Sequence, residues 1–254
     1  MSASYVHLNV ENKVGYIEFY NPPHNALPAA MLATLTELIE TAGSDPSIAV
    51  IVLKSGGDRT FCAGASFDEL MAISNPKEGT AFFEGFANVI NALRNCPKIT
   101  IGRVQGKAVG GGVGLAAATD YCIATTHSEI KLSELTIGIG PFVIEPAVTR
   151  KIGLSAMSQL SLEATQFFSP QWAQEKGLFM KLCPSIESLD SEVKQLAEQL
   201  CKYNPEALQK LKEIFWKDTD DWSELLSERA AISGRLVLSD VTKTQLKKYK
   251  YTTL

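Results

Sequence analysis

The chain has 254 residues, of which 45% are hydrophobic, so it can form one large domain or a domain with an appendage. Its net charge of −4 offers no basic surface for nucleic acid. Five cysteines without a C-x-x-C pair and three histidines far apart in the sequence argue against a disulfide framework and against a metal site. Because no apolar run approaches the length of a membrane span and no N-terminal signal is visible, we expect a cytoplasmic protein without a membrane or nucleic-acid partner.

Apolar strands and amphipathic helices alternate over the first part of the chain. Clusters of proline or glycine separate them, since proline removes a backbone donor from a strand and cannot continue a helix. This alternation predicts an α/β fold in which helices cover a sheet. The predicted strands are 14–20, 49–53, 99–104 and 121–124, and the predicted helices are 28–43, 66–73, 80–95 and 115–118, with a capping box formed by Ser66 and Glu69.

Helical patterns dominate from about Glu145 onward, apart from one short strand near 179–183. We therefore predict two parts. Residues 1–190 form the α/β core that carries the functional site, and residues 191–254 form a C-terminal helical region with an expected role in oligomerisation. Such a region packs either on a neighbouring subunit or on its own core, and the sequence pattern does not distinguish the two.

Two segments of small residues follow apolar strands and precede helices. They are Phe61-Cys62-Ala63-Gly64-Ala65 and Gly110-Gly111-Gly112-Val113-Gly114. The first turn of a helix leaves backbone N–H groups without internal partners, so two such turns that face each other can hold one oxygen atom on which negative charge develops. A glycine triplet alone more often serves the tight packing of a helix on a strand. Because the two segments occur together, we favour an oxyanion hole, which indicates an enzyme.

Several motifs make the chain recognisable when they are taken in order: 21–27 (NPPHNAL), 61–65 (FCAGA), 105–112 (QGKAVGGG), 120–124 (DYCIA) and 134–141 (ELTIGIGP). Together they resemble the enoyl-CoA hydratase/isomerase (crotonase) superfamily, and the resemblance covers nearly the whole chain. It implies a crotonase-like spiral of β-β-α turns with a C-terminal helical region, and assembly into a homotrimer or a dimer of trimers. It also implies an acyl-CoA thioester as substrate and no cofactor apart from the coenzyme A of that substrate.

The same resemblance assigns roles to individual residues. The backbone N–H groups of Ala65 and Gly111 would hold the thioester oxygen, and Glu134 would be the catalytic acid–base residue, although a glutamate at a loop entrance is by itself more often a surface residue. A proton next to a thioester carbonyl is removed only if the enolate oxygen is stabilised, and one well-placed donor contributes about 3–4 kcal/mol. The apolar neighbours of Glu134 are expected to raise its pKa toward neutrality, which suits proton transfer. The substrate-binding residues expected by similarity are Ala63, Gly64, Gly110, Gly114, Pro141 and Phe142.

Gly114 occupies the position where the hydratases of this superfamily carry a second glutamate. Adding water to a double bond uses two carboxylates in those enzymes, whereas one carboxylate can take a proton from C2 and return it at C4. We therefore expect a Δ3,Δ2-enoyl-CoA isomerase, and we disfavour a dienoyl-CoA isomerase, which needs an acid at this position. The alternatives are a hydratase with a non-standard second acid and a catalytically degenerate acyl-CoA-binding protein. The candidates for a second acid are Asp68, Glu69, Glu84 and Glu145, each of which is otherwise a solvated or capping residue.

Three other patterns admit both a structural and a functional interpretation. Phe82, Phe83 and Phe86 could line an acyl pocket, but their helical spacing favours an ordinary core stripe. Cys62 has no histidine in its motif, which favours a small buried residue over a nucleophile. Segment 112–117 matches the G-x-G-x-x-A fingerprint of dinucleotide-binding folds. That segment does not directly follow a strand, so the dinucleotide interpretation is disfavoured.

Overall fold

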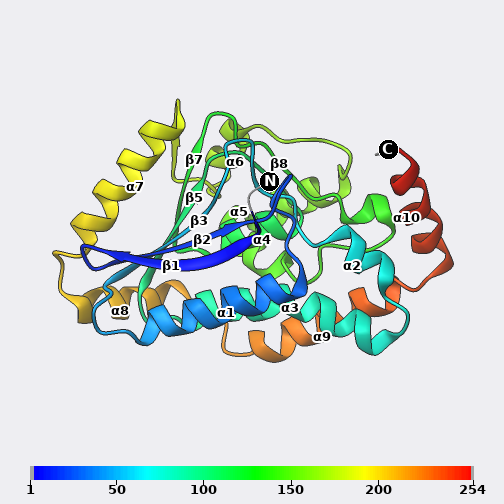
Figure 1. The fold of residues 1–254 in the computed structure, drawn as a ribbon, viewed down its shortest axis with the longest axis horizontal. Helices are drawn as coiled ribbons and strands as arrows, with labels where there is room; N and C mark the ends of the chain where they lie inside the picture. The colour runs from blue at the N-terminus through cyan, green and yellow to red at the C-terminus, as the bar shows by residue number, and fades with distance from the viewer. Residues whose placement is uncertain (1–2, 253–254) are drawn as a thin grey trace.

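The computed structural model describes residues 3–252 and contains two β-sheets (Figure 1). The strands of the larger sheet are β1 (Tyr5–Glu11), β2 (Val14–Tyr20), β3 (Val50–Ser55), β5 (Ile99–Val104), β7 (Tyr121–Thr125) and β9 (Lys181–Cys183). They lie in the order β1-β2-β3-β5-β7-β9, and all neighbours run parallel except the antiparallel pair β1 and β2. The central strands β3 and β5 are buried on both faces, which explains why most of their residues are apolar.

A smaller parallel sheet consists of β4 (Thr60–Cys62), β6 (Lys107–Val109) and β8 (Ile130–Lys131), in that order. Each of its strands follows a strand of the larger sheet and precedes a helix, so the chain repeats a β-β-α unit three times. The helices of these units are α2 (Phe67–Ala72) with α3 (Pro76–Asn95), α4 (Gly111–Ala118), and the 3-10 helix η1 (Glu134–Ile137) with α5 (Glu145–Leu162). The predicted α/β fold built from β-β-α turns is therefore confirmed.

Helices cover both faces of the larger sheet. On one face, α1 (Ala29–Ser44), α3 and α9 (Trp222–Leu236) lie side by side in Figure 1 and contribute to the main hydrophobic core. On the other face, α7 (Ile186–Leu200) packs on the sheet through Leu189, Val193 and Ala197, whose spacing of four is that of an amphipathic helix. The remaining helices are α6 (Pro170–Glu175), α8 (Pro205–Phe215) and α10 (Asp240–Thr252).

The capping box predicted at the start of α2 forms only in part. Ser66 Oγ accepts a hydrogen bond from the N–H of Glu69 at 3.4 Å, as predicted. The reciprocal bond does not form, because Glu69 Oε2 accepts from the N–H of Ala29 at 2.8 Å and the N–H of Ser66 donates to the carbonyl oxygen of Leu27. Glu69 thus joins α2 to the first turn of α1.

The C-terminal helices pack on the core of their own chain. The predicted boundary between residues 190 and 191 falls inside α7, which covers the larger sheet. Farther along, α9 crosses α3 so closely that a Cβ at Gly79 would lie 2.6 Å from the carbonyl oxygen of Gly234. A role of this region in oligomerisation stays a prediction. Within residues 3–252, no helix combines the length and the apolar character that crossing a membrane requires.

Candidate active site

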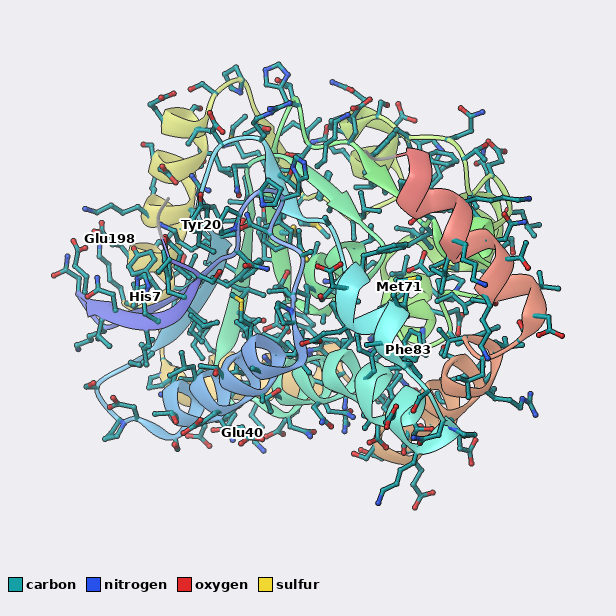
Figure 2. All side chains as sticks on the ribbon, turned by 45° about the vertical axis from the view of Figure 1, so that its right-hand side comes forward. His7, Tyr20, Glu40, Met71, Phe83 and Glu198 are labelled. Carbon is teal, nitrogen blue, oxygen red and sulfur yellow. The ribbon has the colours of Figure 1, made fainter. Side chains whose placement is uncertain are left out.

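A cavity of about 180 Å³ lies where the two small-residue segments, η1 and α9 meet. Most of its wall is apolar, and phenylalanine side chains of α2 and α3 form one side of it. Figure 2 labels one of them, Phe83 of α3, close to Met71 of α2, and both pack on a hydrophobic cluster that includes Leu246 of α10. Of the predicted site residues, those that line the cavity are Ala63, Gly64, Ala65, Gly110, Gly111, Glu134, Pro141 and Phe142.

The two small-residue segments face each other across one end of the cavity. A Cβ at Gly64 would lie 3.1 Å from the carbonyl oxygen of Val109 and 3.5 Å from the amide nitrogen of Gly111, and the φ of +89° at Gly64 favours glycine, so the two turns approach each other closely. The first segment is held in place by Leu27, whose N–H donates to the carbonyl oxygen of Gly64 at 2.8 Å. Over the described part of the chain, neither the N–H of Ala65 nor that of Gly111 donates to a protein acceptor. Both donors therefore remain for a ligand oxygen.

Gly110 brings the second turn next to Glu134. Its backbone has φ +53° and ψ −120°, a conformation that residues with a side chain rarely adopt. Its N–H donates to the carbonyl oxygen of Lys131 at 2.9 Å, which joins the end of β6 to the end of β8 just before η1. A Cβ at Gly110 would lie 2.8 Å from Glu134 Oε1, so only glycine lets the carboxylate approach this closely.

The Glu134 carboxylate is held in an apolar environment without a compensating charge. The residue as a whole is half-buried, but its Oε2 is inaccessible to solvent and accepts no hydrogen bond from the described residues. Burial raises the pKa of Glu134 to about 7, from an ordinary value of 4.5, because desolvation disfavours the charged form. A carboxyl group with such a pKa can exchange a proton readily near neutral pH.

The sequence model of the enoyl-CoA hydratase/isomerase family matches residues 9–248, which is most of the chain. The protein belongs to the enoyl-CoA hydratase/isomerase family. An acyl-CoA thioester as substrate is consistent with this family, and the predicted superfamily is confirmed.

Most of the relatives of this chain are named as enoyl-CoA hydratases. The chain is 28% identical to enoyl-CoA hydratase AKT6-1 of Alternaria alternata over 216 residues, 83% of this chain and 70% of that one. It is 31% identical to the mitochondrial enoyl-CoA hydratase of Pongo abelii over 191 residues, 74% of this chain and 64% of that one. It spans 59% of the length of two further Alternaria alternata hydratases. The solved enoyl-CoA hydratase of Bacillus halodurans has the same fold, with a TM-score of 0.89 at 22% identity over 96% of this chain and 100% of that one.

Gly114 does not line the cavity of this family member, although we expected it among the substrate-binding residues. It lies inside α4 and is fully enclosed. A Cβ at this position would lie 2.6 Å from Cβ of Ile144, and Ile144 itself lines the cavity. Ile144 therefore fills the space that a side chain at position 114 would occupy.

The four acids considered as replacements for a second glutamate do not reach the cavity. Glu69 caps α1, as described above. Glu84 Oε1 accepts a hydrogen bond from Ser227 Oγ on the outer side of α3. Glu145 Oε1 accepts from Thr149 Oγ1 at 2.6 Å within α5, and Asp68 is exposed. Among the described residues that line the cavity, Glu134 is the one with an ionisable side chain.

The sequence left open whether the three phenylalanines of α3 form a core stripe or line a pocket, and the structure shows both. Phe82 and Phe86 are buried in hydrophobic clusters, and all three line the cavity. Cys62 is fully buried, and burial raises the pKa of its thiol to about 12, so it is a packing residue as expected.

The dinucleotide fingerprint is contradicted by the position of its glycines. Gly112 and Gly114 lie within α4 and not in a loop before it. A Cβ at Gly112 would lie 2.8 Å from Cβ of Cys62, and position 114 is closed by Ile144. Neither glycine can therefore approach a pyrophosphate, which is what the fingerprint requires.

Several lining residues were missed by sequence analysis. The hydroxyl-bearing ones are Ser133, next to Glu134, and Ser233, which lies far along the sequence on α9. Ser233 could have been noticed because it interrupts the apolar stripe of its helix. The apolar ones are Phe67, Leu70, Ile137, Ile139, Val143 and Ile144.

Proposed function

We propose that this family member shifts the double bond of a 3-enoyl-CoA ester to give the conjugated 2-enoyl-CoA ester, with Glu134 as the single acid–base residue. The observation that carries the proposal is the cavity itself, where one carboxylate stands beside two free backbone donors and the position of a second carboxylate is filled by Ile144. Moving a double bond requires one group that takes up and returns a proton, whereas adding water requires two.

The proposed first step removes a proton from C2. Glu134 takes the proton, the C2–H electron pair moves toward C1, and the thioester oxygen becomes an enolate oxygen. This oxygen accepts hydrogen bonds from the N–H groups of Ala65 and Gly111, which are fixed in place before the reaction begins. Donors of this kind stabilise the developing charge by about 3–4 kcal/mol each.

In the second step Glu134 returns the proton at C4. The electrons of the dienolate then move to form the C2=C3 double bond and restore the thioester carbonyl. Atoms and charge balance without water, cofactor or a second acid. The raised pKa of Glu134 supports its role in proton transfer, since a carboxylate with an ordinary pKa would be a weaker base for removing a proton from carbon.

The test is a comparison of two substrate types on one purified enzyme. We expect trans-3-hexenoyl-CoA to be converted to 2-hexenoyl-CoA, followed by the absorbance of the conjugated thioester, at a rate at least ten times that of crotonyl-CoA hydration. Rapid hydration of crotonyl-CoA without isomerisation would instead favour the hydratase activity named for its relatives. Tight binding of CoA esters without either reaction would favour a degenerate binding protein.

We also propose that the chain assembles as a homotrimer or a dimer of trimers. Large apolar side chains are exposed on two helices that lie next to each other, since Arg150 Nε of α5 donates to the carbonyl oxygen of Phe215 of α8 at 2.9 Å. Exposed apolar patches of this kind support an interaction surface. Light scattering after gel filtration should give about three or six times the monomer mass. The exposed residues are Leu154, Leu162, Leu211, Ile214 and Phe215.

A further inference from the structure

Ser233 is a polar residue in the apolar stripe of α9. The stripe that faces the core consists of Trp222, Leu226 and Ala230, and it continues through position 233 to Val237 just beyond the helix. At this spacing of three and four residues an apolar side chain is expected. Ser233 is 1% exposed and lines the cavity.

The hydroxyl of Ser233 makes no hydrogen bond to any described residue. Serines in helices commonly donate to the carbonyl oxygen four residues earlier, as Ser158 of α5 does to Leu154 at 2.9 Å. Ser233 Oγ forms no such bond. A serine hydroxyl that opens onto a cavity and has no partner in the protein is available to a group bound there.

The backbone around Ser233 is held firmly against α3. A Cβ at Gly234 would lie 2.7 Å from the carbonyl carbon of Gly79, so the two helices meet backbone to backbone at this point. Farther along, α3 contacts the turn that carries Gly111 through Phe86, because a Cβ at Gly111 would lie 2.5 Å from Phe86 Cζ. Seven residues of helix separate these two contacts, which corresponds to roughly 10 Å. Ser233 and the oxyanion donors therefore belong to parts of the cavity wall that contact α3 at positions roughly two helical turns apart.

We propose that Ser233 hydrogen-bonds a neutral polar group, a hydroxyl or a carbonyl, on the acyl chain of the substrate beyond the reacting carbons. The proposal rests on the acyl-CoA function given above and names the substrate class: short acyl-CoA esters with an oxygen substituent. A carboxylate substituent fits poorly, since no lysine, arginine or histidine is among the described residues that line the cavity. A plain hydrocarbon chain would leave the hydroxyl without a partner.

The experiment compares saturated CoA esters in isosteric pairs, in which a terminal hydroxyl replaces a methyl group. The three pairs are 4-hydroxybutanoyl and pentanoyl, 5-hydroxypentanoyl and hexanoyl, and 6-hydroxyhexanoyl and heptanoyl esters, measured by isothermal titration calorimetry. In at least one pair the hydroxy ester should bind about five times more tightly to the natural protein. Ser233→Ala should abolish that preference. Ser227→Ala should preserve it, because Ser227 lies on the same helix but donates outward to Glu84.

Saturated esters can be neither isomerised nor hydrated, so this result is independent of the reaction type. If the natural protein does not isomerise 3-enoyl-CoA esters but prefers the hydroxy esters, the proposed reaction is overturned and the role of Ser233 stands. Equal binding within all three pairs, or a preference that survives in Ser233→Ala, would overturn the role of Ser233. The melting temperature adds a further readout: Ser233→Ala should keep or raise it, and a fall of several degrees with unchanged ligand preference would show a structural role instead.

Discussion

The side chain of Ile144 occupies the space above Gly114, with the Ile144 Cβ only 2.6 Å from where a Cβ at position 114 would stand. Ile144 is 4% exposed and reaches the cavity wall, so the two positions share one volume. A carboxylate at position 114 and an isoleucine at position 144 are therefore mutually exclusive. The absence of a second acid therefore depends on Gly114 and on Ile144 together.

A glutamate introduced at position 114 alone should not give the protein hydratase activity. We expect Gly114→Glu to destabilise the protein by about 1–3 kcal/mol through overpacking, without increasing crotonyl-CoA hydration. The double variant Gly114→Glu with Ile144→Ala should recover much of that stability and hydrate crotonyl-CoA at least tenfold faster than the natural protein. Ile144→Ala alone is the control. Urea unfolding and a coupled hydration assay measure both properties, and a stable, hydrating single variant would contradict the argument.

Removing the proposed base should separate turnover from binding. Glu134→Gln keeps the size of the side chain but cannot accept a proton from carbon. Isomerisation should fall by about 10²–10⁴-fold, while hexanoyl-CoA binds with nearly the same Kd. Glu84→Gln is the matched control, since Glu84 lies on the outer side of α3 and should leave activity unchanged. Equal activity of Glu134→Gln and the natural protein would exclude Glu134 as the base.

The pH profile should report the raised pKa of Glu134. Its value of about 7 means that the ionised form, which is the base, is the minor species below neutrality. The ratio kcat/KM should therefore rise about tenfold per pH unit up to pH 7 and level off above it. Steady-state rates from pH 5.5 to 9 measure this. A profile that is flat down to pH 5.5 would show that Glu134 ionises with its ordinary pKa.

The fold could be predicted from sequence where local patterns decide it. The strand 99–104 is observed with the same bounds, because β-branched residues fill four of its six positions and favour a buried strand of a parallel sheet. The helix after the glycine segment was predicted from 115, but it begins at Gly111, since glycines have low helix propensity and only tertiary contacts extend the helix through them.

The site could be predicted only in the parts that lie in contiguous motifs. Glu134 and the two small-residue turns are in such motifs, and the structure brings them to one cavity. The contributions of Ser233 and Ile144 depend on how α9 and the start of α5 pack, which is decided by contacts between residues far apart in sequence. The partner of Glu69 was missed for the same reason, because Ala29 lies forty residues away.

Stability should depend on pH through the same carboxyl group. Because folding raises the pKa of Glu134 from 4.5 to about 7, the folded state binds the proton more tightly, and stability from this group is lost as the pH rises from about 4.5 to 7. Glu134→Gln should therefore be more stable than the natural protein at pH 8, by up to about 3 kcal/mol, and by much less at pH 5. Urea unfolding at both pH values measures the difference. An equal effect at the two values would contradict the burial of the charge.

The buried ion pair between Asp120 and Lys212 should dominate the stability of the junction between β7 and α8. Lys212 Nζ lies 2.9 Å from Asp120 Oδ2, both side chains are at most 3% exposed, and Asp120 Oδ1 accepts from Trp216 Nε1 at 2.7 Å. Lys212→Met leaves a buried carboxylate without its cation, so we expect a loss of about 3–5 kcal/mol. The matched control is Lys210→Met, which breaks an exposed pair with Glu213 and should cost less than about 1 kcal/mol. Urea unfolding compares the two variants, and similar midpoints would show that the buried pair contributes no more than the exposed one.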